Sequence, residues 1–181
     1  MLRTTIRHRI TLLLGICCLA LTLTAAADDL HLAQPRADLF TAGQPSAAQL
    51  TELAQRGVRH VIDLRGPDEA RGYDEVALSH ELGMSYLSLP ISGADDLNGA
   101  NAHALKQALD AADGPVLLHC ASSNRVGALL ALMAAQEEQL SDAAALQLGL
   151  QAGMKSLQPV VRDKLQSKTL CDGVDLANGN C

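Results

Sequence analysis

The chain has 181 residues, a formal net charge of −6 at pH 7 and an aromatic content of 2%. Once an N-terminal leader is removed, this length suits a single domain. An acidic chain with so few aromatic side chains and no cluster of lysine or arginine offers neither the charge nor the stacking surface that nucleic acids need, so nucleic-acid binding is excluded.

The first 27 residues have the pattern of a secretory signal peptide. Arg3, Arg7 and Arg9 form a basic start, residues 10–24 are almost continuously apolar, and the alanines at 25–27 fit a cleavage site. A retained membrane anchor is the alternative, but the apolar run is shorter than the roughly 20 residues that a spanning helix needs. We therefore expect a periplasmic or secreted protein with no membrane attachment after cleavage.

The mature chain begins with a lead-in segment, residues 28–38, which shows little periodicity. Residues 39–42 then form a short apolar stretch that predicts a strand. Ser46, with Gln49 three residues later, has the pattern of a capping box and predicts a helix that ends near Gly57.

Strands and helices alternate through the rest of the domain. Strands are expected at residues 58–64, 84–91 and 116–119, because these stretches are apolar and bounded by turn residues. Helices are expected at residues 67–82, 102–112, 125–139, 141–151 and about 153–166. This alternation predicts one α/β domain at residues 39–167, with a mainly parallel central sheet flanked by helices.

One stretch, VLLHCASSNRVG at residues 116–127, combines a buried strand, a polar turn and the start of a helix. Cys120 lies at the turn. There the backbone N–H groups, the helix dipole and Arg125 can all point at one small anion, and a thiol in such a field ionises more easily than a free thiol. The pattern predicts a nucleophile with an anion-binding loop, and the alternative is a small core cysteine.

Polar loops follow several of the expected strands, at Arg65, at Asp95 and Asp96, and at Cys120. Because ligands of open α/β sheets bind beyond the carboxyl ends of the strands, we expect these loops to lie on one rim.

Cys120, Cys171 and Cys181 remain after signal cleavage. An exported chain folds where disulfides persist, and Cys171 and Cys181 lie in or beside a short polar tail, residues 168–181, which they could close into a loop. We expect these two to pair and Cys120 to stay free. The histidines are too scattered for a recognisable metal site, and no cofactor is expected.

The stretch HCASSNRVG at residues 119–127 resembles the signature loop of the cysteine-dependent phosphatases. Together with TAGQPS at 41–46, VIDLR at 61–65 and LPI at 89–91, it resembles the phosphatase-like domain of the beta-lactamase hydrolase-like proteins, over about residues 39–136. The resemblance implies a tyrosine-phosphatase-like α/β fold and a small anionic phosphoester as substrate.

The resemblance also implies roles for individual residues. Cys120 would attack phosphorus, Arg125 would bind two oxygens of the phosphoryl group, and Asp95 or Asp96 would protonate the leaving oxygen. The loop N–H groups that complete the cradle would come from Ala121, Ser122, Ser123 and Asn124.

Two residues beside the loop are expected to support it. His119 is expected to be a buried hydrogen-bonding partner that orients the turn. Arg65 is expected to form a structural ion pair with Glu69.

The loop departs from the phosphatase pattern in two ways. Only four residues separate Cys120 from Arg125, where phosphatases have five. Four is typical of rhodanese-like sulfurtransferases, which implies, as an alternative, transfer of sulfur from a donor such as thiosulfate through a Cys120 persulfide. Ser123 replaces the usual glycine at a left-handed position, at a cost of ~1 kcal/mol, which favours a third alternative, an inactive domain that binds an anion or a protein partner.

Overall fold

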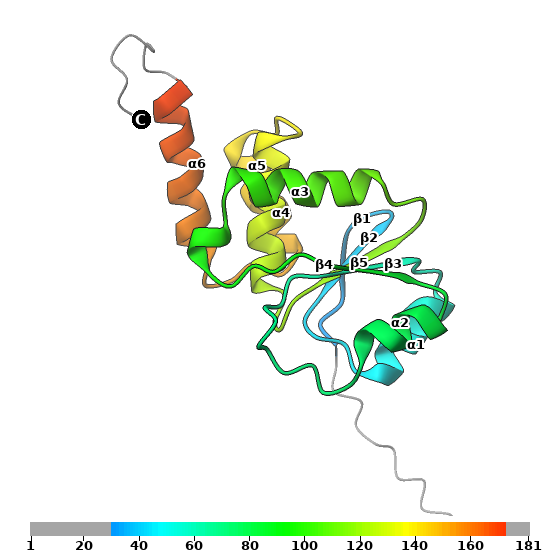
Figure 1. The fold of residues 1–181 in the computed structure, drawn as a ribbon. Coiled ribbons are helices and arrows are strands. Elements are labelled where there is room, and N and C mark those ends of the chain that lie inside the picture. The colour runs from blue at the N-terminus through cyan, green and yellow to red at the C-terminus, as the bar shows by residue number, and fades with distance from the viewer. Residues whose placement is uncertain (1–29, 173–181) are drawn as a thin grey trace, which may run out of the picture.

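A computed structural model describes residues 30–172, and side chains as far as residue 167. Five strands form one sheet in the order β1-β2-β5-β3-β4, with helices on both faces (Figure 1). The strands are β1 (Ala33–Arg36), β2 (Leu39–Ala42), β3 (His60–Asp63), β4 (Ser85–Ser88) and β5 (Val116–His119). The helices are α1 (Ala47–Gln55), α2 (Glu75–Glu81), η1 (Ala94–Asp96, a 3-10 turn), α3 (Gly99–Asp110), α4 (Asn124–Gln136), α5 (Asp142–Gln151) and α6 (Gln158–Asp172).

Strands β2, β5, β3 and β4 run parallel, and β1 pairs antiparallel with β2. The expected single α/β domain with a mainly parallel sheet is confirmed. Strand β1 lies inside the lead-in segment, where no strand was predicted. Its sequence AQPR lacks apolar alternation, and it pairs only with β2 at the edge of the sheet, where a proline is tolerated.

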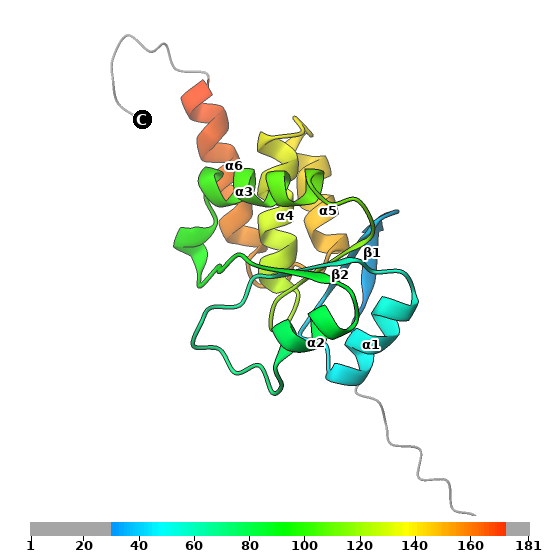
Figure 2. The ribbon, with the colours of Figure 1, turned by 45° about the vertical axis from the view of Figure 1, so that its right-hand side comes forward.

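The side chains of the central strands alternate between two apolar cores. Val61 and Leu117 pack with residues of α1 and α2 on one face, whereas Ile62 and Leu118 pack with residues of α3 to α6 on the other. Both views show α1 and α2 on one side of the sheet and the remaining helices on the opposite side (Figure 2). Because β3 and β5 are buried on both faces, the loops that follow them are held on a rigid base.

Helix α1 has the predicted capping box, in which Ser46 and Gln49 bond each other's backbone N–H. The predicted helix at 67–82 is wrong in its first half, since α2 begins only at Glu75 with Asp74 as its N-cap. The segment before it is held in turns instead. Glu69 accepts from the N–H of Gly66, and the Arg71 guanidinium donates to carbonyl oxygens of the same segment.

Two predictions concern the ends of the chain, which lie largely outside the residues that the structure describes. Residues 1–27, Cys181 and the side chain of Cys171 lie outside the described residues, so the signal peptide and the disulfide stay predictions. Helix α6 continues to Asp172, into the segment expected to be a polar tail. Between residues 30 and 172, no helix has both the length and the hydropathy required to cross a bilayer.

Candidate active site

The Cys120 loop leaves the carboxyl end of β5, between the ends of β2 and β3. Its backbone is tied to β2 and the segment after it, because Cys120 N donates to Ala42 O at 3.4 Å and Gln44 N donates to Ala121 O at 3.3 Å. A Cβ atom at Gly43 would lie only 3.1 Å from Ala121 O, so glycine allows this close approach. Cys120 itself is fully buried and forms no disulfide with any described cysteine.

Ser123 precedes α4 with φ of 64°, in the left-handed region. The left-handed position expected from the missing glycine is therefore confirmed. The Ser123 side chain does not cap the helix, and its buried Oγ has no hydrogen-bond partner among the described residues. The loop thus keeps the shape that glycine would favour, although a serine occupies the position.

Arg125 lies in the first turn of α4 and forms an ion pair with Glu69. Its Nη1 and Nη2 donate to the Glu69 carboxylate at 2.5 and 2.7 Å, and Nη1 also donates to Ile91 O at 2.8 Å. The hydrogen bonds from Arg125 lower the pKa of Glu69. The hydrogen bonds to Glu69 raise the pKa of Arg125, and a hydrogen bond and attraction to Cys120 act in the same direction.

These contacts hold the Arg125 guanidinium beside Cys120. A guanidinium has five N–H donors, and the bonds to Glu69 and Ile91 use three of them. The other two N–H groups make no hydrogen bond to Glu69 or Ile91 O. The ion pair expected between Arg65 and Glu69 is wrong, because Glu69 pairs with Arg125 and Arg65 is buried among other acids.

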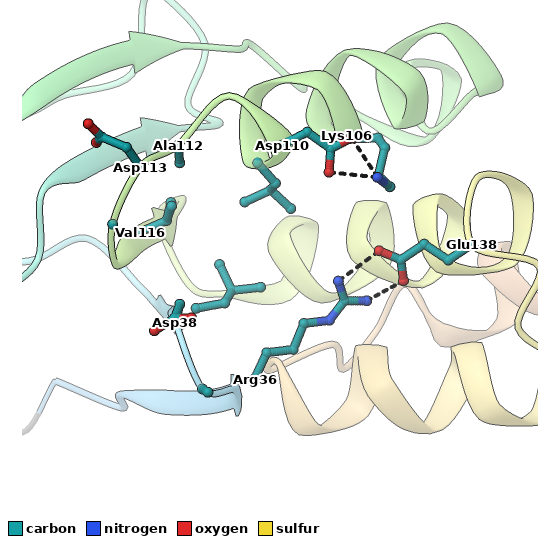
Figure 3. A pocket seen from close by; sticks show the side chains of 12 residues that line it. Arg36, Asp38, Lys106, Asp110, Ala112, Asp113, Val116 and Glu138 are labelled. Carbon is teal, nitrogen blue, oxygen red and sulfur yellow. Dashed lines mark hydrogen bonds and ion pairs between the residues drawn. The ribbon is translucent and has the colours of Figure 1, made fainter.

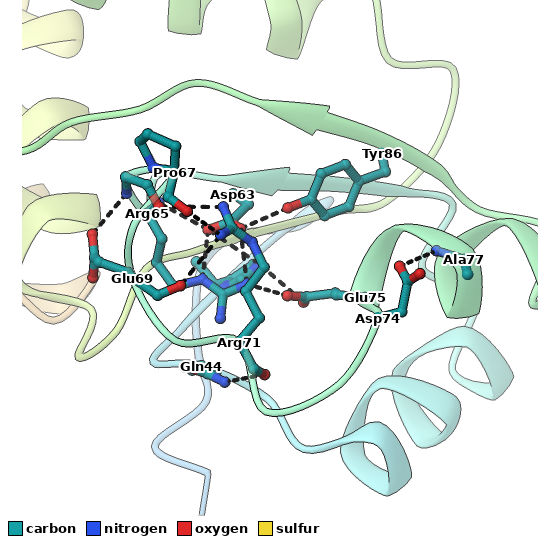
Figure 4. A network of polar contacts seen from close by, with 12 residues as sticks. Gln44, Asp63, Arg65, Pro67, Glu69, Arg71, Asp74, Glu75, Ala77 and Tyr86 are labelled. Carbon is teal, nitrogen blue, oxygen red and sulfur yellow. Dashed lines mark hydrogen bonds and ion pairs between the residues drawn. The ribbon is translucent and has the colours of Figure 1, made fainter.

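Arg65 lies at the centre of a buried polar network (Figure 4). It donates to both oxygens of Asp63, through Nε at 2.9 Å and Nη2 at 2.8 Å, and it also bonds Glu75. Tyr86 donates to Asp63 at 2.6 Å, and His119 Nε2 lies 3.1 Å from Glu75 Oε1. The network therefore brings β3, β4 and α2 against His119, the residue that precedes Cys120. His119 is buried as expected, but the hydrogen bonds expected of it are not found, because neither of its ring nitrogens has a hydrogen-bond partner among the described residues.

Opposing effects set the pKa values in this network. Burial by itself would raise the pKa of Asp63, but hydrogen bonds from Arg65, the nearby His119 and Tyr86 outweigh it and lower this pKa to about 2. Burial and the bond to Asp63 raise the pKa of Tyr86 to about 12. Asp63 is therefore held as a carboxylate throughout the physiological range.

Asp63, Glu75 and His119 place ligand atoms close enough together to hold a metal ion. However, Arg65 donates to both carboxylates, so the cation between them is its guanidinium. The ion pairs of Asp63 and Glu75 with Arg65 were not predicted from the sequence. The acidic residue in VIDLR was visible, but nothing in the sequence indicated that Glu75 would reach the same arginine.

The two predicted acid candidates lie on η1. Asp95 is exposed, whereas the Asp96 carboxylate accepts from Ser92 N at 2.7 Å. Beside Arg125 is a hollow of about 420 Å³, which is lined by Gly66, Pro67, Asp68, Glu69, Ser92 and Arg125. The structure therefore places Asp68, which was not predicted, in this hollow, and its lining includes neither predicted aspartate.

A larger hollow, of about 770 Å³, lies at the opposite end of the sheet (Figure 3). Its lining includes Leu39 and Val116, the first residues of β2 and β5. Two ion pairs cross its walls, Arg36 with Glu138 and Lys106 with Asp110. Because Cys120 follows the far end of β5, this hollow does not belong to the cysteine site.

Residues 30–137 match the family model described as "Beta-lactamase hydrolase-like protein, phosphatase-like domain". The chain belongs to this family. Among curated proteins, the beta-lactamase hydrolase-like proteins of Xylella fastidiosa and Agrobacterium fabrum are each 32% identical to this phosphatase-like domain over 98 residues, or 52% of the chain. The match spans only 22% of the length of those relatives.

Solved structures show where the fold of this phosphatase-like domain recurs. P. aeruginosa TpbA has a TM-score of 0.63 and 24% identity, over 86% of this chain and 95% of TpbA. Tk-PTP in its active form has a TM-score of 0.59 and 18% identity, over 76% of this chain and 97% of that protein. The expected tyrosine-phosphatase-like fold is confirmed.

Proposed function

We propose that this phosphatase-like domain hydrolyses phosphomonoesters through a phosphocysteine on Cys120. The observation that carries the proposal is the placement of Arg125, whose guanidinium Glu69 and Ile91 O hold beside Cys120. Membership of the phosphatase-like family supports this proposal. The similarity to TpbA supports it too, because the cysteine-to-serine variant of TpbA, which has a TM-score of 0.54 to this chain, has been solved in complex with pTyr. A small phosphoester is thus the proposed substrate class.

The proposed reaction has two displacements at phosphorus. In the first, the Cys120 thiolate attacks phosphorus, the bond to the leaving oxygen breaks, and a carboxylic acid gives that oxygen its proton. In the second, the same carboxylate takes a proton from water, the water oxygen attacks phosphorus, and the S–P bond breaks. Arg125 and the loop N–H groups from Ala121 to Asn124 bind the phosphoryl oxygens throughout.

Three aspartates are candidates for the acid. Asp95 and Asp96 follow β4. Asp95 is exposed and no described residue bonds its carboxylate, whereas the Asp96 carboxylate accepts from Ser92 N, and this favours Asp95. Asp68 is the third, because it lines the hollow beside Arg125. Replacement of the true acid by asparagine should lower kcat for a poor leaving group about 100-fold or more, and far less for a good one.

The test is hydrolysis of aryl phosphates by the wild-type chain and by Cys120→Ser, with the three asparagine variants in parallel. Asp113→Asn is the matched control, since Asp113 lies at the opposite end of the sheet and pairs with His60. We expect turnover by the wild type, none by Cys120→Ser, and a leaving-group-dependent loss in one aspartate variant. A wild-type protein that hydrolyses no aryl phosphate would refute the proposal.

A second candidate is sulfur transfer, which the four-residue span between Cys120 and Arg125 favours. The Cys120 thiolate would attack the outer sulfur of thiosulfate, the S–S bond would break with release of sulfite, and an acceptor thiol would then remove the sulfur. Trapping and weighing the Cys120 adduct separates the two chemistries, because phosphate and sulfur add different masses. If neither adduct forms, the remaining alternative is an inactive domain that binds an anion or a partner.

We also propose that residues 1–27 direct export and that Cys171 pairs with Cys181. The basic, apolar and small-residue pattern of the first segment supports export, and the polar sequence between the two cysteines supports the bridge. Mass spectrometry of the periplasmic or secreted protein without reduction tests both. We expect a chain that begins at Asp28 and lacks two hydrogen atoms relative to the reduced form.

A further inference from the structure

Two hollows flank the Cys120 loop, and they differ in charge. The hollow beside Arg125 includes Glu69, which pairs with Arg125, and the further acid Asp68. The other, of about 260 Å³, lies against the exposed loop residues and is lined by Leu30, His31, Gly43, Gln44, Gln49, Ala121, Ser122 and Lys155. No acid is among these lining residues. The chain as a whole has a net charge of −6, but this smaller hollow offers the positive charge of Lys155 to an anionic group.

The segment that carries Lys155 is fastened to the loop. The Asn124 side chain accepts from Lys155 N at 2.7 Å and from Leu157 N at 3.3 Å, and it donates to Ser156 Oγ at 2.8 Å. Asn124 is the residue before Arg125, so the link between α5 and α6 keeps a fixed place relative to the anion-binding loop.

The Lys155 ammonium is available to a ligand. Its backbone N–H is used by Asn124, but no described residue forms an ion pair or hydrogen bond with its Nζ. The side chain is exposed and lines the smaller hollow together with Ala121 and Ser122. The match to the family model ends at residue 137, so Lys155 belongs to the part of the chain beyond it.

We propose that the Lys155 hollow binds a second acidic group, a carboxylate or a second phosphate, on the same substrate whose phosphoester occupies the Cys120 loop. The proposal rests on the proposed phosphatase function. The hollow is large enough for one such group, and a cation there stabilises the group, whereas Asp68 in the hollow beside Arg125 would repel it. Lys155 is therefore a specificity-determining residue.

The experiment compares phenyl phosphate with 3- and 4-carboxyphenyl phosphate, using the wild type, Lys155→Ala and Lys155→Glu. A second arm uses phosphotyrosine peptides with Glu or Gln beside the phosphotyrosine, which separates small acids from acidic peptides as the source of the group. Lys155→Ala keeps the backbone bond to Asn124. Lys106→Ala is the matched control, because Lys106 lies at the opposite end of the sheet.

We expect Lys155→Ala to lower kcat/KM about tenfold for one of the acidic substrates and to leave phenyl phosphate and the Gln peptide within about twofold. Lys155→Glu should lower kcat/KM for that acidic substrate further, and Lys106→Ala should leave kcat/KM unchanged for every substrate. Equal effects on acidic and neutral substrates would overturn the inference alone. No hydrolysis of any substrate by the wild type would overturn the proposed function and the inference with it.

Discussion

Gly153 lies directly against Ser123, so closely that a Cβ atom at residue 153 would overlap the Cβ atom of Ser123 and come within 3.1 Å of its Oγ. Gly153 also has φ of 101°, a conformation that other residues rarely adopt. The α5–α6 link therefore makes room for the serine that stands at the left-handed position of the cysteine loop. The two positions are sterically complementary, because the absence of a side chain at Gly153 leaves the space that the Ser123 side chain fills.

Gly153→Ala should lower the free energy of unfolding by several kcal/mol, because it adds both backbone strain and overlap with Ser123. Gly57→Ala is the matched control, since Gly57 has φ of 95° but nothing within 4 Å of an added Cβ, and it should cost only about 1 kcal/mol. The double variant Ser123→Gly, Gly153→Ala should recover part of the loss. Urea unfolding measures all of these, and strictly additive losses would contradict a direct contact.

The strand, turn and helix around Cys120 could be predicted because their signals are local. The apolar run, the polar turn and the alanine- and leucine-rich helix are adjacent in sequence, and Ser123 was expected in the left-handed region that the structure gives it. The partner of Glu69 could not be predicted in the same way. Arg65 is four residues away and Arg125 is 56 away, and only the parallel pairing of β3 with β5 brings the distant arginine near.

The start of α2 was mispredicted for a related reason. Residues 67–69 have the composition of a helix start, but Glu69 bonds Gly66 N and Arg125, and these contacts hold the segment outside a helix. Tertiary contacts to a loop more than 50 residues away thus override a local preference. The hydrogen bonds of the site join residues that are far apart in sequence. They were therefore harder to predict than the strands and helices, whose signals are local.

Asp63→Asn should destabilise the chain at pH 7 by about 2 kcal/mol or more, because it removes a buried charge that Arg65 and Tyr86 both bond. The pKa of Asp63 is lowered to about 2, below the ordinary value near 3.8. The stabilisation is therefore fully present above pH 4 and is lost as the pH falls toward 2.

Urea unfolding of wild type and variant at pH 7 and at steps down to pH 2 measures this. The difference between them should shrink as the pH falls below 4. Asp110→Asn is the control, because its pair with Lys106 is exposed and should contribute at most ~0.5 kcal/mol. A difference that does not change with pH would show that the Asp63 charge has no part in it.

Gly127→Ala should destabilise the chain by several kcal/mol, because an added Cβ would overlap Gly149 O and Met154 N and lie 2.7 Å from Met154 Cβ. Helices α4 and α5 cross here through paired glycines, since a Cβ at Gly149 would in turn lie 2.6 Å from Gly127 O. Gly99→Ala is the control, with its nearest neighbour at 3.5 Å, and should be neutral or slightly stabilising. Thermal unfolding compares the two, and equal melting temperatures would contradict the close crossing.

Glu69→Gln should lower kcat/KM for aryl phosphates roughly tenfold, because the neutral amide holds Arg125 less firmly than the carboxylate does. Glu69 acts through Arg125, so its role is positioning, and its effect should depend on its charge. Arg125 lowers the pKa of Glu69, which therefore stays ionised above about pH 5 and gains its proton only in more acidic solution, below the ordinary value of 4.5.

The ratio of wild-type to Glu69→Gln activity should accordingly be constant above pH 5 and fall toward one in acid, as the wild-type carboxylate is neutralised. Glu52→Gln is the matched control, because Glu52 is exposed on α1 and away from the cysteine loop. A merely structural role would give a ratio that follows the melting temperature instead of the charge of Glu69. Measuring both across the same pH range decides between them, because a loss of activity that occurs at a pH where the variant is fully folded, and that disappears as Glu69 is protonated, follows the charge of Glu69 and not the stability of the fold.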